Sequence, residues 1–384
     1  MSNAAQTGDV TTVTNALPNL RKRSREPEQE VESVKRIKSD ERLQQASEQA
    51  GPLPQAVLLI HAARSFLSAA HALSPKLSCP RSSKEVLCLY RQHVLSAAAC
   101  LRAALSAAAS APNHKPEHDL VARLELIEVL ITEAETGSTN TASRREVEGL
   151  LHKGLLNSQK HAAFRRYYLA LVSAQIRFNS LGTGSSASEK LAKAEAKRMA
   201  NQMHSNSTED PYWIYHFQLL HHSLAPTQQS FSSLVEIANA RGDKTVLAFF
   251  QLMRAQWAMG EKKWDVAKAD LAIVATFLAA QQDTKVAPVS QLELHYLAIR
   301  CIYDAQANAS SKAEAEVKAS LKQIHGMLDS NAKVSAGERT GHITLPLQPS
   351  GSASTSSSIT LKTIPRPHMY ILVFLITAYA YRDP

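Results

Sequence analysis

The chain has 384 residues, enough for two or three ordinary domains or for one continuous array of helices. It is rich in alanine, leucine, serine, lysine and glutamate and has only 13 glycines, so helix is favoured over sheet; the net charge of +9 bears on association, not on the fold. Four cysteines (Cys79, Cys88, Cys100 and Cys301) without CxxC spacing, and a start without a basic and apolar leader, argue against a secreted disulfide scaffold.

Residues 1–50 are polar, carry mixed charge and contain no aromatic residue, so we expect a disordered tail. Two basic clusters lie in it about ten residues apart, a spacing that resembles a bipartite nuclear import signal. The alternative is a merely solvated charged tail, but the two-part spacing favours import and therefore a nuclear protein. The clusters consist of Arg21, Lys22, Arg23 and Arg25, then Lys35, Arg36 and Lys38.

Apolar residues recur at spacings of three and four from Gln55 to about residue 330, and glycine, proline, asparagine or serine interrupts the pattern many times. We therefore expect residues 51–330 to form helices of about 14 to 20 residues joined by short breaks. One large bundle and a stack of helical hairpins both fit this pattern.

A local motif favours the stack of hairpins. Trp264, Ala267 and Leu271 occupy the offsets of the second helix of a tetratricopeptide repeat, and Ala255 and Ala258 precede them where two helices must approach closely. Each hairpin of such a stack exposes an apolar face that only its neighbours bury. The predicted fold is all-α, a superhelical solenoid of degenerate tetratricopeptide-like hairpins.

The composition changes at residues 331–365, where glycine, serine, threonine and proline predominate, so we expect a flexible insertion. Residues 366–384 regain a helical pattern, and the apolar stretch 369–381 is shorter than the roughly 20 residues that a spanning helix needs. We read it as the start of a further repeat helix and expect no membrane partner. Because repeat arrays normally end in a polar cap, we expect a truncated array.

No catalytic or metal-binding pattern emerges. Gly182-Thr-Gly184 lacks the third glycine of a dinucleotide site, and Pro116 separates His114 from His118. The other candidates are explained by packing or by solvated helix faces: His216, His221 and His222, and the carboxylate pairs Glu125 with Glu128 and Glu314 with Glu316. We therefore expect no enzyme activity, no cofactor, no metal and no small-molecule substrate.

Basic residues of the helical body are scattered, and most have glutamate nearby, as at Arg165, Lys193 and Lys318. No helix-turn-helix, finger or RNA-binding signature accompanies them. A weak contact with DNA stays open, and an acidic protein partner would use the same charge.

A more specific pattern begins at Asp210-Pro-Tyr-Trp-Ile-Tyr-His-Phe-Gln-Leu-Leu220, which contains Pro211, Tyr212 and Trp213. It continues through 231–248, with Gly242 and Asp243, and through 251–259. This order of motifs resembles the cohesin loading factor family, the small tetratricopeptide-like subunit of the sister-chromatid cohesin loader. The likeness extends more faintly from about residue 57 to 328, and residues 367–384 look like a helix from the middle of such proteins.

The resemblance implies a superhelix whose central channel encloses the extended N-terminal segment of the large HEAT-repeat subunit of the loader. It implies indirect contact with cohesin and chromatin, a nuclear location, and a role in sister chromatid cohesion and chromosome segregation during cell division. The family has no catalytic residues to transfer. Two alternatives stay open: a generic tetratricopeptide-like adaptor, whose carboxylate-clamp residues we do not find, and a helical nucleic-acid-binding protein.

Overall fold

The computed structural model describes residues 54–77, 84–110, 115–135, 141–159, 161–181, 186–205, 209–281, 287–307, 311–329, 341–348 and 357–380. Of these residues 88% are helical, so the all-α prediction is confirmed. The predicted tail and its basic clusters lie outside the described residues.

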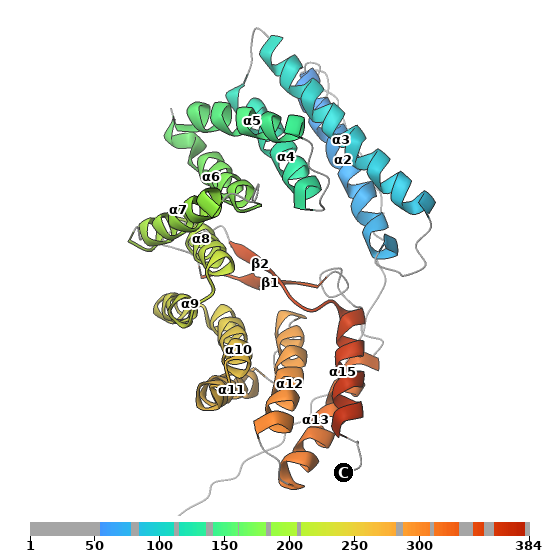
Figure 1. Cartoon of the computed structure of the whole chain (residues 1–384), viewed down its shortest axis with the longest axis vertical. Helices are drawn as coiled ribbons and strands as arrows, with labels where there is room; N and C mark the ends of the chain where they lie inside the picture. Colours follow the sequence, from blue (N-terminus) through green and yellow to red (C-terminus); the bar gives the residue numbers. More distant parts are fainter. Residues whose placement is uncertain are drawn as a thin grey trace, which may run out of the picture. The chain divides into compact units, whose positions relative to one another are not determined.

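The elements follow one another along the chain as labelled in Figure 1. The helices are α2 (Gln55–Leu77), α3 (Lys84–Ser110), α4 (Pro116–Glu135), α5 (Thr141–Gln159), η1 (Ala162–Phe164), α6 (Arg165–Ser180), α7 (Ser186–Ser205), α8 (Pro211–Leu224), α9 (Gln228–Arg241), α10 (Lys244–Gly260), α11 (Trp264–Ala280), α12 (Ala287–Ala307), α13 (Ser311–Asp329) and α15 (Arg366–Ala380). The strands are β1 (His342–Pro346) and β2 (Ser358–Lys362).

From α2 to α13 each α-helix packs against the next one in the chain, and α15 packs on α12 and α13. In addition α4 packs on α6, α6 on α8, and α10 on α12. In the described part of the chain, neither α8 with α10 nor any two successive helices of the set α5, α7, α9, α11 and α13 pack to a comparable extent. The stack therefore bends locally toward α4, α6, α8, α10 and α12, which we call the inner helices; their common side is the inner face. The superhelical solenoid with a closed channel stays a prediction.

Two buried clusters form the core, and α6 connects them. Its residues Leu171, Ala174 and Phe178 belong to the amino-terminal cluster, while Leu169 and Ile176 belong to the carboxy-terminal one. Opposite sides of one helix thus face different clusters, as the 3.6-residue period dictates. This continuity from one helix to the next is expected where each apolar face is buried only by its neighbours.

Local sequence fixes the helix ends from α8 to α10. The carboxylate of Asp210 caps α8 by accepting from the backbone N–H of Tyr212 at 2.9 Å, with Pro211 in the first turn. Thr227 and Ser230 form a reciprocal capping box at the start of α9. Gly242 ends α9 at a φ of 75°, in the left-handed region that glycine adopts without strain.

Within residues 331–365, where the composition predicts a flexible insertion, two stretches form an antiparallel hairpin. His342 pairs with Lys362 and Pro346 with Ser358 in the β1–β2 register. The apolar residues alternate, so one side of the hairpin is buried: Ile343, Leu345, Leu347, Ile359 and Leu361. Serine and glycine content concealed this short period-two pattern. The apolar stretch after it does form a helix, α15.

By length and composition alone, α2 over Gln55–Ser74 and α3 could cross a membrane. Alanine supplies much of this apolar character, and charged residues near the middle of each helix form ion pairs with other helices. Arg64 of α2 lies 2.6 Å from Glu125 of α4, and Arg102 of α3 lies 2.7 Å from Glu146 of α5. These contacts favour a helical pair packed on its neighbours, because an ionised pair deep in a bilayer is costly.

Candidate protein-binding surface

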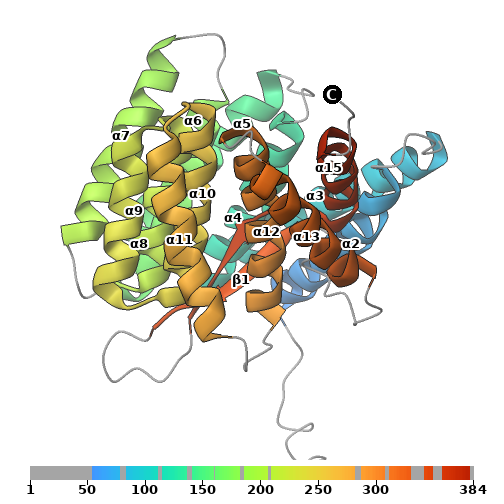
Figure 2. The same ribbon diagram turned by 90° about the horizontal axis from the view of Figure 1, so that it is seen from below.

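The β1–β2 hairpin lies on the inner face. Strand β1 contacts α10 and α12, and β2 contacts α8. Figure 1 shows the two strands between α8 and α12, and Figure 2 shows β1 beside α12. A two-stranded sheet is at best marginally stable alone. Burial of its five apolar side chains against the inner helices therefore supplies its stability, at roughly 25 cal/mol for each Å² of apolar surface removed from water.

Asp243, at the turn between α9 and α10, fastens one end of the hairpin. The residue is only 2% exposed, and its carboxylate accepts three hydrogen bonds. The phenol of Tyr215 donates to Oδ2 at 2.6 Å, Nε of Arg241 donates to Oδ2 at 3.1 Å, and the backbone N–H of Gln348 donates to Oδ1 at 2.6 Å. Arg241 Nη2 also donates to the carbonyl of Gln348 at 3.2 Å. Burial, followed by the Asp243 hydrogen bond and charge, raises the pKa of Tyr215, so the phenol stays a donor.

Gln291 of α12 fastens the other end of the hairpin. Its Nε2 donates to the carbonyl of His342 at 3.2 Å and to Oγ1 of Thr363 at 3.3 Å. The backbone N–H of Thr363 donates to the carbonyl of Gly341 at 2.8 Å, which closes the ladder there. The hairpin is thus held by polar contacts at both ends and by apolar burial between them.

An aromatic cluster joins α6 to α8. The rings of Tyr212 and His216 stack with centroids 5.5 Å apart, and Trp213 meets His216 edge-on at the same distance. Nε2 of His216 lies 2.7 Å from Oγ of Ser173 on α6. Burial, with a smaller contribution from the charge of Arg177, lowers the pKa of His216 to about 4, so the imidazole is neutral near pH 7.

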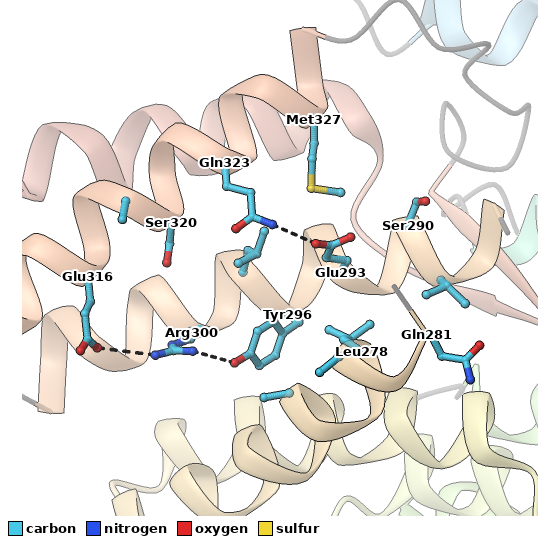
Figure 3. A pocket seen from close by; sticks show the side chains of 15 residues that line it. Leu278, Gln281, Ser290, Glu293, Tyr296, Arg300, Glu316, Ser320, Gln323 and Met327 are labelled. Atoms are coloured by element: carbon cyan, nitrogen blue, oxygen red, sulfur yellow. Dashed lines mark hydrogen bonds and ion pairs between the residues drawn. The ribbon is translucent and has the colours of Figure 1, made fainter. Parts of the chain in front are cut away.

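A pocket of about 740 Å³ lies between α11, α12 and α13 (Figure 3). Its polar side chains bind one another across the pocket. Arg300 Nη1 donates to the hydroxyl of Tyr296 at 3.0 Å and Nη2 lies 3.5 Å from Glu316, while Gln323 donates to Glu293 at 2.9 Å. The Arg300–Glu316 and Gln323–Glu293 pairs connect α12 to α13, so the polar lining serves the packing of the helices.

A family model described as cohesin loading factor matches residues 55–382, which is most of the chain. The chain belongs to the cohesin loading factor family. No match was found among curated proteins or among solved structures. Membership assigns this cohesin loading factor a role in cohesin loading, contacts within the loading machinery, and a nuclear role connected with chromatin.

The motif residues that suggested the family occupy packing positions in the factor. Pro211 begins α8 and is buried, Gly242 is the left-handed cap, and Ala267 and Leu271 of α11 are buried. Trp264 packs at the core and meets the ring of Tyr303 edge-on, with centroids 6.1 Å apart. These residues build the helical body, and Asp243 also accepts a hydrogen bond from the backbone of Gln348 beyond β1.

The sequence candidates rejected as catalytic or metal sites are only partly within the described residues. His114 and residues 182–184 lie outside the described residues, while His222 is buried and 2.8 Å from the hydroxyl of Ser230. Within the described ranges, no three His, Cys, Asp or Glu side chains gather as a metal site.

Sequence reasoning missed the residues that fasten the hairpin: Tyr215, Arg241, Gln291 and Gln348. The available signal was the alternation Ile343-Thr-Leu-Pro-Leu347 and Ile359-Thr-Leu361.

Proposed function

We propose that this factor is a non-catalytic scaffold subunit of the cohesin loader, and that its inner face encloses the extended N-terminal segment of the large HEAT-repeat subunit. One observation carries the proposal beyond family membership: the inner face already holds extended chain, the factor's own strands β1 and β2. A concave helical face that accepts an extended segment is the surface that such a partner needs.

The scaffold role is supported by how the buried ionisable groups are used. Asp270 receives two hydrogen bonds from Arg254, at 2.8 and 2.5 Å, which tie α11 to α10. Burial raises the pKa of the Cys301 thiol to about 11, so the thiolate that nucleophilic chemistry requires is scarce near pH 7. These groups stabilise helix packing.

Of the two alternatives, direct nucleic-acid binding receives little support from the charge distribution. Several arginines pair with carboxylates of other helices or, for Glu209, of the segment before α8, which reduces the positive charge offered to phosphates. The pairs are Arg64 with Glu125, Arg102 with Glu146, Arg165 with Glu209, and Arg177 with Glu128 and Glu135. A steep salt dependence of DNA binding by the isolated chain would support the nucleic-acid alternative. The other alternative is a generic adaptor. Such an adaptor would bind unrelated extended peptides as tightly as it binds the segment of the loader subunit.

The deciding experiment is co-expression of the factor with the N-terminal segment of a loader large subunit, followed by size-exclusion chromatography. We expect one stable complex. A scrambled segment is the control, and Ile273→Asp on α11, an exposed position outside the inner helices, should leave the complex intact. Failure of the native segment to co-purify with a chain shown to be helical by circular dichroism would contradict the proposal.

Nuclear entry through the basic clusters is a separate proposal with its own test. A reporter fused to residues 1–50 should accumulate in the nucleus. Replacing Lys35, Arg36 and Lys38 with alanine should disperse it, and unchanged accumulation would contradict a bipartite signal.

A further inference from the structure

The two open edges of the hairpin differ in what they offer to another chain. Leu347 donates to the carbonyl of Ser357 at 2.9 Å and Thr363 donates to that of Gly341 at 2.8 Å, so the odd-numbered residues of this register form the ladder. In an antiparallel pair the residues between them direct their backbone N–H and C=O groups outward. These are His342, Thr344 and Pro346 on β1, and Ser358, Thr360 and Lys362 on β2.

The edge of β1 is partly closed. Pro346 has no N–H to donate, and the carbonyl of His342 accepts from Gln291 at 3.2 Å. Proline and covering side chains are common means by which proteins protect an edge strand from pairing with another chain.

The edge of β2 has neither protection. Its three outward residues include no proline, their side chains are exposed, and no residue in the described ranges makes a hydrogen bond with their backbone groups. The strand also lies beside α8 on the inner face, where the partner segment is proposed to run. A row of unpaired donors and acceptors next to buried apolar side chains is a template for one more strand.

We propose that an extended segment of the partner adds to β2 as a third strand, antiparallel or parallel, with apolar side chains at alternate positions beside Ile359 and Leu361. This inference rests on the proposed function, because it names the surface on which the enclosed segment pairs. Backbone hydrogen bonds to Ser358, Thr360 and Lys362 supply affinity, and the alternate side chains supply specificity. The mixed helical and strand contact explains why a helical scaffold keeps a hairpin on its inner face.

The hairpin offers a matched pair of variants. Thr360→Pro removes the outward N–H of β2, and Thr344→Pro removes the outward N–H of β1. Neither N–H belongs to the internal ladder, and Thr344 and Thr360 are cross-strand neighbours with Oγ1 atoms 3.0 Å apart, so both variants lose the same side-chain contact. They differ only in which edge they block.

Binding of the labelled segment to the full chain should be measured by fluorescence anisotropy for the wild type and both variants. We expect Thr360→Pro to weaken binding by about tenfold or more and Thr344→Pro to change it by less than about twofold. Equal binding by all three proteins, or weakening by Thr344→Pro alone, would overturn third-strand pairing at β2 while leaving the proposed function intact. Absence of binding by the folded wild type would instead contradict the proposed function.

A second measurement needs no substitution and therefore no assumption about folding of the variants. Hydrogen exchange of the wild-type chain should show slower exchange at the amides of Ser358, Thr360 and Lys362 when the segment is bound. Slower exchange at Thr344 with none at Thr360 would overturn the proposal, and so would unchanged exchange on both strands. If both proline variants weaken binding equally, this measurement decides between pairing at β2 and a general loss of the hairpin.

Discussion

Replacement of Asp243 by asparagine should detach the hairpin from the inner face. The carboxylate accepts from Tyr215, Arg241 and the backbone of Gln348 with both oxygens. An asparagine has one acceptor oxygen, so its Nδ2 must face either the N–H of Gln348 or the donors of Tyr215 and Arg241. At least one hydrogen bond to a charged acceptor is lost, about 1.5 to 3 kcal/mol, and Arg241 loses its buried counter-charge. We expect a loss of about 3 kcal/mol, part of it confined to hairpin docking.

A second buried aspartate provides the control. Asp270 is 1% exposed and pairs with Arg254 between α10 and α11, and it makes no hydrogen bond with the described residues of the hairpin. Asp270→Asn should lower the free energy of unfolding by a similar amount.

Urea unfolding measures the global loss, and hydrogen exchange at residues 341–348 and 357–363 measures docking of the hairpin. Only Asp243→Asn should accelerate exchange there under native conditions. Unchanged exchange, or a global loss below about 1 kcal/mol, would refute the role given to Asp243.

Burial lowers the pKa of His216 in the folded chain to about 4, against 6.5 for an unperturbed imidazole, so its contribution to stability is complete above pH 6.5 and is lost as the pH falls toward 4. His216→Gln keeps a polar partner for Ser173 but does not titrate. Between about pH 7 and pH 4.5, the free energy of unfolding measured in urea should therefore fall by up to about 3 kcal/mol less for this variant than for the wild type. An equal fall for both proteins would contradict this. Gly149→Ala should stabilise the chain by about 0.5 to 1 kcal/mol, because nothing lies within 4 Å of the added Cβ inside α5, whereas Gly242→Ala should destabilise it by about 1 kcal/mol or more at its φ of 75°. Thermal unfolding with the opposite order would refute the backbone argument. Ala267→Leu should cost about 1 to 3 kcal/mol by overpacking the α10–α11 contact, where the alanine is fully buried, and an unchanged midpoint of unfolding would contradict that packing.

The helical body was predictable because its information is local. Apolar spacing of three and four fixes helix type, and single residues such as Asp210 and Gly242 mark helix ends through capping chemistry. The family resemblance also rested on such local blocks. What neighbouring residues do not determine is how far the stack of hairpins curves, since that depends on small differences in packing between many helices.

The hairpin was not predictable by the same reasoning. Its two apolar alternations are five residues or fewer, and a serine-rich stretch separates them. Short strands gain their stability from the surface on which they dock, so composition alone indicates a loop. The hydrogen bond from the backbone of Gln348 to Asp243 joins residues 105 positions apart, and no local pattern near either residue predicts it.

Docking of the hairpin and binding of the partner should therefore be coupled. If the partner pairs with β2, its binding site exists only while β1 and β2 lie on the inner face. The apparent affinity for the segment therefore decreases as the fraction of molecules with a docked hairpin decreases. Asp243→Asn should then weaken segment binding although the hydrogen bond of Asp243 goes to Gln348, two residues beyond the end of β1, and not to β2. Asp270→Asn, with a similar loss of global stability, should leave the affinity unchanged. Anisotropy titrations of the two variants measure this difference, and equal affinities would show that the segment binds the helices without using the hairpin.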